Sequence, residues 1–85
     1  MRFIPVRVKT RDEVKIPGVP KYVEIEGENL EITSIEQQWH EAYQDPTFYP
    51  MEYFKVTISS GKRYILRYST LFKSWGIAQY QKGKA

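Results

Sequence analysis

Two stretches of alternating side chains around a three-residue loop constrain the fold of this chain most. The alternating apolar residues are Phe54, Val56 and Ile58, followed by Tyr64, Leu66 and Tyr68. A loop at 59–61 brings both sets onto one face, whereas a two-residue loop would place Arg63 and Arg67 there instead. Gly61 then falls at the loop position that needs a left-handed residue in a type I turn with a G1 bulge. These residues predict a β-hairpin with a single apolar face.

Shorter alternating stretches on either side predict further antiparallel strands. Residues 22–33 read as a second hairpin with an acidic outer face and a turn at 27–29. Trp75 and Ile77 alternate with small residues and predict a strand after the central hairpin. Phe3 to Val8 also has strand character, but Pro5 has no amide hydrogen, which favours an edge position. A turn at Pro17-Gly18 would follow it, so residues 1–20 are expected to form an edge strand and a turn.

The segment 34–43 fits two structures equally well. Ile35, Trp39 and Tyr43 recur at helical spacing. Ile35, Gln37 and Trp39 also fit a strand that continues from Ile32 through a β-bulge. The sequence leaves both alternatives open. Residues 45–50 contain two prolines and predict a loop.

The fold class expected from these elements is mainly β. Eighty-five residues make one domain, residues 1–85, in which a small antiparallel meander curls into a roll or half-barrel. Large aromatic side chains are expected to supply much of the core, which closes around Trp39, Phe54, Leu66 and Trp75. One short helix at 35–43 is the alternative for that segment, and residues 82–85 are expected to form a frayed tail.

The composition argues against an enzyme. The chain has no cysteine and one histidine, His40, so neither a thiol nucleophile nor a cysteine or multi-histidine metal site can form. If the segment were helical, Glu36 and His40 would share a face at i, i+4, which could form half of a metal site or an acid–base pair. No G-x-S-x-G motif and no phosphate-binding glycine loop occurs. We therefore expect no catalytic residues, no metal and no cofactor.

No segment has the composition of a membrane span. The longest apolar run has three residues, and the first seven residues carry charge too early for a signal peptide. These features predict a cytoplasmic protein that does not bind membranes.

Charge is segregated along the chain. Residues 22–52 contain eight acids and no lysine or arginine, whereas residues 53–85 contain seven bases and no acid. One interpretation is that acidic strands pair with basic strands inside one sheet, which stabilises the sheet slightly. The other is a dipolar molecule with one basic face. The sequence is compatible with both.

The second face of the central hairpin is the candidate binding surface. The hairpin register puts Tyr53, Lys55 and Thr57 opposite Arg67, Ile65 and Arg63, with Gly76, Ala78 and Tyr80 extending the same face. Nucleic-acid-binding sheets use cations for phosphates and aromatic rings for bases. This composition predicts a weak nucleic-acid site whose residues are Tyr53, Lys55, Arg63, Arg67 and Tyr80.

A protein–protein adaptor is the alternative function. Ile65 lies in the middle of the otherwise polar face, so either the N-terminal strand or a partner would have to cover it. An exposed strand edge could also pair with a partner. Binding to nucleic acid should weaken steeply with salt, whereas an apolar contact should not.

The aromatic pattern resembles a small bacterial domain family of unknown function. Its parts are Trp39, the stretch Glu52-Tyr-Phe-Lys-Val-Thr-Ile-Ser-Ser-Gly-Lys-Arg-Tyr-Ile-Leu-Arg-Tyr, and Ser74-Trp-Gly-Ile. The match covers roughly residues 20–80, but Phe48-Tyr49 stands where the family has a Trp-Trp pair. Similar domains occur attached to proteins related to error-prone DNA polymerases. The resemblance therefore implies a strand at 34–40 and a role near DNA, and it supplies no catalytic residue.

Overall fold

The computed structural model describes residues 2–11, 18–41 and 51–80, and this part of the chain is entirely β. It contains six strands: β1 (Ile4–Thr10), β2 (Pro20–Ile25), β3 (Glu28–Glu41), β4 (Met51–Ile58), β5 (Arg63–Ser69) and β6 (Ser74–Gln79). All pairings are antiparallel between neighbours, and β1 also pairs with β6, so the meander closes into a small barrel. The predicted fold class, a mainly β antiparallel meander that curls on itself, is confirmed.

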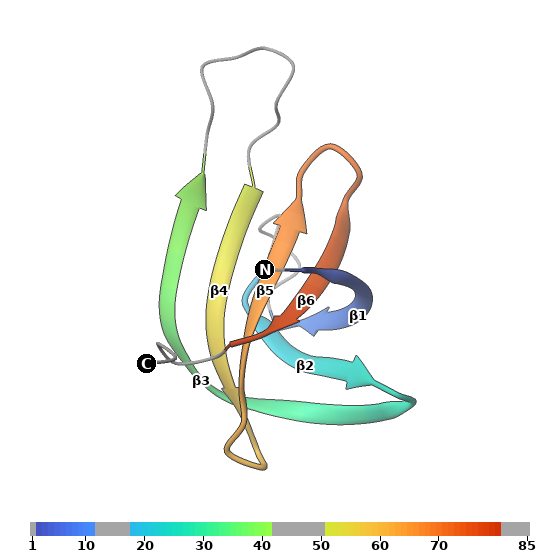
Figure 1. Ribbon diagram of the computed structural model, residues 1–85, viewed down its shortest axis with the longest axis vertical. Coiled ribbons are helices and arrows are strands. Elements are labelled where there is room, and N and C mark those ends of the chain that lie inside the picture. Colours follow the sequence, from blue (N-terminus) through green and yellow to red (C-terminus); the bar gives the residue numbers. More distant parts are fainter. Residues whose placement is uncertain (1, 12–17, 42–50, 81–85) are drawn as a thin grey trace.

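Long and short strands play different parts in this barrel. In Figure 1, β4 and the second part of β3 run along the length of the molecule, whereas β1, β2 and the first part of β3 run across it. The long β3 makes this geometry, because its first residues pair with β2 and its remainder pairs with β4. The barrel is therefore closed at one level, while β3, β4 and β5 extend beyond it as a curved sheet.

The edge position predicted for the first strand holds only locally, because within the described ranges β1 has one neighbour at Pro5 but lies between β6 and β2 in the closed barrel. β1 pairs with β6 over Ile4–Val6 and with β2 over Arg7–Thr10. Pro5 lies opposite Gly76 of β6, and the pairing with β2 begins only two residues later. At Pro5, β1 has a neighbour on one side only among the described strands, so it forms fewer backbone hydrogen bonds there than a strand paired on both sides. Proline, which has no N–H to donate, is tolerated at such a position. The predicted turn at Pro17-Gly18 includes Pro17, which lies outside the described residues.

The second hairpin is confirmed, but its turn lies earlier than predicted. Val23 pairs with Leu30 and Ile25 pairs with Glu28, which leaves Glu26 and Gly27 as a two-residue turn. Both turn residues have positive φ, 52° and 81°. This is the backbone of a type I′ turn, whose twist matches that of the strands it joins. The predicted turn at 27–29 did not include Glu26, a residue type that is uncommon at positive φ.

Residues 35–41 form a strand and not a helix. β3 has two irregularities against β4, one between Ile32 and Ser34 and one between Ile35 and Gln37. Each inserts an extra residue and shifts the alternation of side chains. As a result, Ile35 lies opposite Val56 and Trp39 lies opposite Tyr53, so the two residues that would share a helical stripe lie on opposite faces of the strand. Residues 42 and 43 of the helical alternative lie outside the described residues, as do the predicted loop at 45–50 and the predicted tail at 82–85.

The central hairpin has the predicted register. Phe54 pairs with Leu66 and Val56 pairs with Tyr64. The Ile58 N–H donates to the Lys62 carbonyl over 3.0 Å, and Gly61 N–H donates to the Ile58 carbonyl over 2.8 Å. Gly61 has φ 94°, as the G1 bulge requires.

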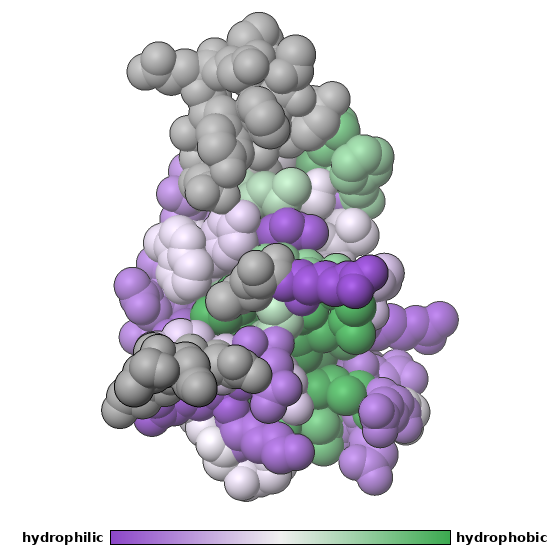
Figure 2. Space-filling model, in the orientation of Figure 1, coloured by the Kyte–Doolittle hydropathy of each residue, from purple (hydrophilic) through white to green (hydrophobic). Residues whose placement is uncertain are grey.

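The core lies inside the barrel and includes only part of the predicted aromatic set. Its buried cluster contains Phe54 and Leu66 with aliphatic residues of the other strands, and Trp75 packs against it half-buried. Trp39 was expected in this core, and that prediction is wrong, because the second bulge, between Ile35 and Gln37, turns it to the opposite face. On the face shown in Figure 2, apolar side chains form a broken strip that hydrophilic side chains border on both sides. No helix in the described ranges is long and apolar enough to cross a membrane.

Candidate nucleic-acid interface

The outer face of the β4–β5–β6 sheet carries all of the predicted binding residues. We use this name for the side turned away from the barrel core, which presents Tyr53, Lys55, Thr57, Arg63, Ile65, Arg67, Gly76, Ala78 and Tyr80. Tyr53 pairs with Arg67, and Arg67 pairs with Gly76, so these three positions lie in one row across the strands. The Tyr80 N–H donates to the Arg63 carbonyl over 3.3 Å, which continues the sheet to the end of the described chain. The register therefore brings the five predicted residues to one face of the sheet.

Ile65 does not form an exposed patch on this face. Its side chain is only 4% exposed. Lys55 and Ala78 flank it in the register, and the Lys55 ammonium reaches across to the Tyr80 ring, 4.2 Å from its centroid. Two residues along the strand, the Arg67 guanidinium covers the Phe3 ring. Neighbours from the same chain enclose Ile65, so the version of the adaptor hypothesis that used it as a docking patch is wrong.

A row of stacked π groups crosses the outer face. The Trp39 and Tyr53 rings are 5.2 Å apart and almost parallel, with 2° between their planes. Tyr53 meets the edge of Phe3 at 6.2 Å, and the Arg67 guanidinium lies 4.3 Å from the Phe3 centroid. We call Trp39, Tyr53, Phe3 and Arg67 the aromatic row. It joins side chains from β3, β4, the N-terminal segment and β5 into one continuous surface.

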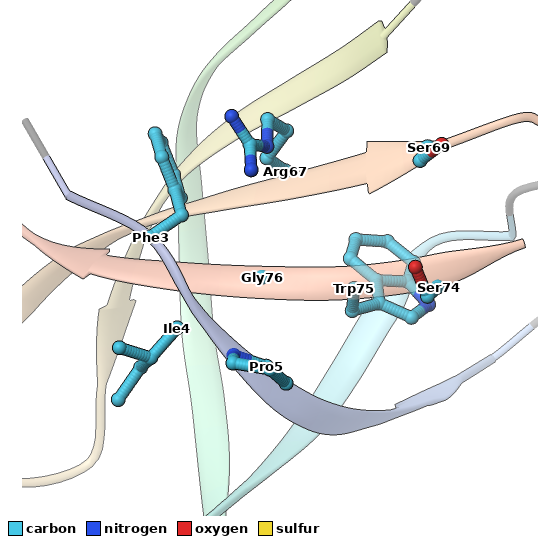
Figure 3. Close-up of a pocket in the computed structure, with 8 residues that line it drawn as sticks. All are labelled: Phe3, Ile4, Pro5, Arg67, Ser69, Ser74, Trp75 and Gly76. Carbon is cyan, nitrogen blue, oxygen red and sulfur yellow. The ribbon is translucent and has the colours of Figure 1, made fainter. Parts of the chain in front are cut away.

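A small pocket adjoins the Arg67 end of the aromatic row. It has a volume of about 160 Å³, and its lining includes Phe3, Arg67, Ser69, Ser74 and Gly76. Figure 3 shows the Arg67 guanidinium turned toward Phe3 above β6, with the two serines further along the same hairpin. A Cβ atom at Gly76 would lie 3.3 Å from the Phe3 Cβ, so the glycine permits the close approach of the N-terminal segment. The Ser69 hydroxyl accepts the Phe72 N–H over 3.2 Å.

Glu36 places a carboxylate among the cations at the other end of the outer face. Its Oε2 lies 3.4 Å from Arg63 Nε, and its Oε1 lies 4.0 Å from Lys55 Nζ. The Thr57 hydroxyl donates to Oε2 over 2.6 Å. This hydrogen bond, opposed by desolvation and aided by Arg63 and then Lys55, lowers the pKa of Glu36 below its ordinary value of 4.5. The carboxylate is therefore ionised at neutral pH and compensates part of the local positive charge.

The five predicted residues consequently fall into two groups. Arg67 and Tyr53 belong to the aromatic row. Lys55 and Arg63 lie beside Glu36, and Lys55 also covers the Tyr80 ring. The interpretation of charge segregation as acid–base pairing between strands therefore holds at this point, because β3 supplies the acid and β4 and β5 supply the bases.

Sequence reasoning missed three residues that shape this surface. Trp39 and Glu36 reach the outer face because of the second bulge in β3, whereas the strand alternative included only one bulge after Ile32. Phe3 belongs to a segment that the sequence placed at an edge. The small side chains at Gly76 and Ala78 were the available signal, because they leave room above the sheet for a covering ring.

His40 has a partner different from the one that helical spacing suggested. Its Nδ1 lies 2.7 Å from Glu52 Oε2, directly across the β3–β4 pairing. The Glu36 carboxylate instead accepts a hydrogen bond from the Thr57 hydroxyl. Across the described ranges, no group of three or more histidine or acidic side chains is placed to hold a metal ion.

Comparison with known proteins adds no relative. The chain matches no protein-family model, no curated protein and no solved structure. The resemblance to a small bacterial domain family thus stays a prediction, and the functional argument rests on the geometry of the chain itself.

Proposed function

We propose that this chain is a non-catalytic module that binds single-stranded nucleic acid on its outer face, and that the aromatic row is the main contact surface. The observation that carries the proposal is the near-parallel pair of Trp39 and Tyr53, continued by Phe3 and Arg67 across three strands. Bases stack on such rings without regard to sequence, and each stacked base contributes about 1–3 kcal/mol.

Arg67 and the adjoining pocket supply the electrostatic part of the interaction. A volume of about 160 Å³ is small for a whole nucleotide, whose pockets generally exceed about 300 Å³, but it can hold a phosphate group. A guanidinium forms paired hydrogen bonds with phosphate oxygens. We expect the phosphate next to a stacked base to sit beside Arg67.

Titration of a labelled oligothymidylate at low salt tests the proposal directly. One available phosphate contact predicts weak binding, with a slope of log affinity against log salt of about −0.7. Trp39→Ala and Arg67→Glu should each abolish it, whereas Trp39→Phe should retain part of it. Lys21→Glu is the matched control for charge reversal, because Lys21 is exposed on β2, away from the outer face. Wild-type protein that fails to bind at low salt would overturn the proposal.

Glu36 provides a gain-of-function test. Replacing it with Gln removes the carboxylate beside Arg63 and Lys55, and so makes two further cations available. Affinity should increase and the salt slope should steepen toward about −2, as for three contacts on a single strand. An unchanged slope in Glu36→Gln would show that these cations lie outside the bound strand.

Protein binding at a strand edge is the second candidate. The pairing of β3 with β2 covers residues 28–31 of β3 and ends at Glu31. Among the described strands, residues 32–41 of β3 therefore have a neighbour, β4, on one side only. The bulges next to Ser34 and Gln37 interrupt the regular spacing that an added strand would need. Nucleic acid is the better-supported partner, and a protein that handles nucleic acid would be distinguished by binding that changes little with salt.

A further inference from the structure

A second and larger hollow opens where β1 leaves β6. β1 pairs with β6 only as far as Val6 and then turns to β2. The hollow has a volume of about 450 Å³, within the range typical of small-ligand sites. We call it the β1–β6 notch. Among its lining residues, Val6, Val8 and Trp75 are half-buried and are called the floor here, and Arg7, Lys9 and Lys73 are exposed and are called the rim.

The floor of the notch offers a flat apolar surface. Trp75 packs toward the core against Phe54, at 5.6 Å, and against Tyr68, at 5.0 Å. It is nevertheless half-buried, so part of the indole remains accessible on the side of the notch. Val6 and Val8 are half-buried beside it. An indole held rigidly by two rings is a suitable surface for a planar aromatic ligand.

The rim of the notch is basic. Arg7, Lys9 and Lys73 are exposed, and within the described ranges none of them takes part in an ion pair. Glu24 is the one carboxylate among the described lining residues. Lys73 has φ 52°, a left-handed conformation that is uncommon for lysine. It lies in the turn directly before β6 and lines the notch. Because three cations and one carboxylate of the described chain line the notch, its net positive charge favours binding of an anion.

We propose that the β1–β6 notch binds a nucleoside 5′-monophosphate group. A phosphate monoester carries a charge of about −1.5 to −2 at neutral pH and would lie among Arg7, Lys9 and Lys73. The base would lie on the indole of Trp75, and Asn29 and Glu24 line the same hollow with groups that can hydrogen-bond to its polar edge. A free nucleotide and the 5′ end of a nucleic-acid strand present the same chemistry.

The notch contains no residue of the aromatic row, but it shares Ser74 and Trp75 with the pocket beside Arg67. In Trp39→Ala the remaining fluorescence comes from Trp75, and the aromatic row is broken. Amide shifts at 6–9 and dependence on Lys73 therefore report on the notch, whereas loss of oligothymidylate binding reports on the outer face. Failure of one proposal is thus distinguishable from failure of the other.

The test is a titration of adenosine 5′-monophosphate into Trp39→Ala, followed by Trp75 fluorescence, with amide NMR shifts recorded on the wild type. Titration to roughly 5 mM reveals any Kd near or below about 1 mM. We expect saturable quenching and shifts clustered at 6–9 and 73–75. Adenosine and inorganic phosphate should each bind at least about tenfold more weakly, since each lacks one half of the contacts. No saturable change, or equal binding of phosphate alone, would overturn the proposal.

Lys73→Gly locates the phosphate. Glycine accepts positive φ, so this variant removes the cation without straining the turn. Affinity for the nucleotide should fall about tenfold, as expected for one charged hydrogen bond, while Lys21→Gln should leave it unchanged. Equal affinity of Lys73→Gly and wild type would show that the anion does not bind in the notch.

Oligonucleotides with and without a 5′-phosphate distinguish the two sources of the ligand. In Trp39→Ala, tighter binding of the phosphorylated strand than of the mononucleotide would support a strand end as the occupant. Preference for the mononucleotide would support a free nucleotide. If the 5′-phosphate made no difference to strand binding and the mononucleotide did not bind either, the notch would not be a nucleotide site.

Discussion

β3 and the β4–β5 hairpin show how far side-chain alternation can be trusted. In the hairpin, alternation is unbroken from Tyr53 to Tyr68 except at a loop whose glycine fixes the register. In β3, two extra residues shift the alternation, and Trp39 faces away from the core. The same kind of pattern therefore gave the correct face in one region and the wrong face in the other.

The difference has a functional consequence. The hairpin alone presents a basic outer face with Arg63, Arg67 and Lys55. The bulged strand beside it adds Trp39, which extends the stacking surface, and Glu36, whose single carboxylate pairs with two cations. β3 thus determines which end of the face is aromatic and at which end the positive charge is partly compensated.

The largest expected effect separates the two tryptophans. Trp75→Ala should lower the free energy of unfolding by about 3–5 kcal/mol, because it removes a large ring packed on Phe54 and Tyr68. A small domain has roughly 5–15 kcal/mol in total, so the variant would be close to unfolding. Denaturant melts measure the loss, with Trp75→Phe as the conservative control. A loss below about 1 kcal/mol would contradict the assignment of Trp75 to the core wall.

The next effect tests the loop that fixes the hairpin register. Gly61→Val should destabilise the fold by about 1–2 kcal/mol, because a β-branched residue is strained at φ 94°. Space is not the reason, since nothing lies within 4 Å of a Cβ at this position. Gly61→Asn should cost less, as asparagine tolerates the left-handed region. Thermal or denaturant melts of both variants would show equal losses if the turn were a different one.

A smaller loss is expected from Trp39. Trp39→Ala should cost about 1 kcal/mol, the scale of a single aromatic stack on a half-buried surface. Denaturant melts alongside Trp75→Ala give the direct comparison between the two faces of the sheet. Similar losses for both tryptophans would place Trp39 in the core and remove the basis for the aromatic row.

The smallest effect concerns Glu36 at the second bulge. Thr57→Val removes the hydrogen bond that contributes most to its lowered pKa, so the pKa should rise toward 4.5. A lowered pKa in the folded state stabilises the protein above the unfolded value, and this stabilisation is lost as pH falls through the folded value. The wild type should therefore lose more stability than Thr57→Val as pH falls below about 4.5.

Carbon-detected NMR titration of the Glu36 carboxyl group measures this pKa directly. Thr33→Val is the matched control, because the Thr33 hydroxyl donates to the Thr57 carbonyl over 3.1 Å and not to Glu36. Identical Glu36 titration curves in wild type and Thr57→Val would show that the hydroxyl does not hold the carboxylate.

Much of the fold could be predicted because its determinants are local. The register around Gly61, the hairpin at 22–33 and the strand at Trp75 all follow from alternation and turn chemistry within a few residues. The surface that carries Tyr53 and Arg67 followed from the same register. The helix or strand choice at 34–43 did not, because bulged alternation and helical spacing coincide over so short a segment.

The sequence by itself determined that this chain forms an antiparallel meander with one apolar side and a basic, tyrosine-bearing outer face. Only the tertiary structure decided that β1 closes the barrel, that Phe3 covers Gly76, and that Glu36 lies beside Arg63. The physical reason is distance along the chain. A hairpin register depends on neighbours a few residues apart, whereas barrel closure and charge pairing depend on which remote strands meet and on where bulges rotate their side chains.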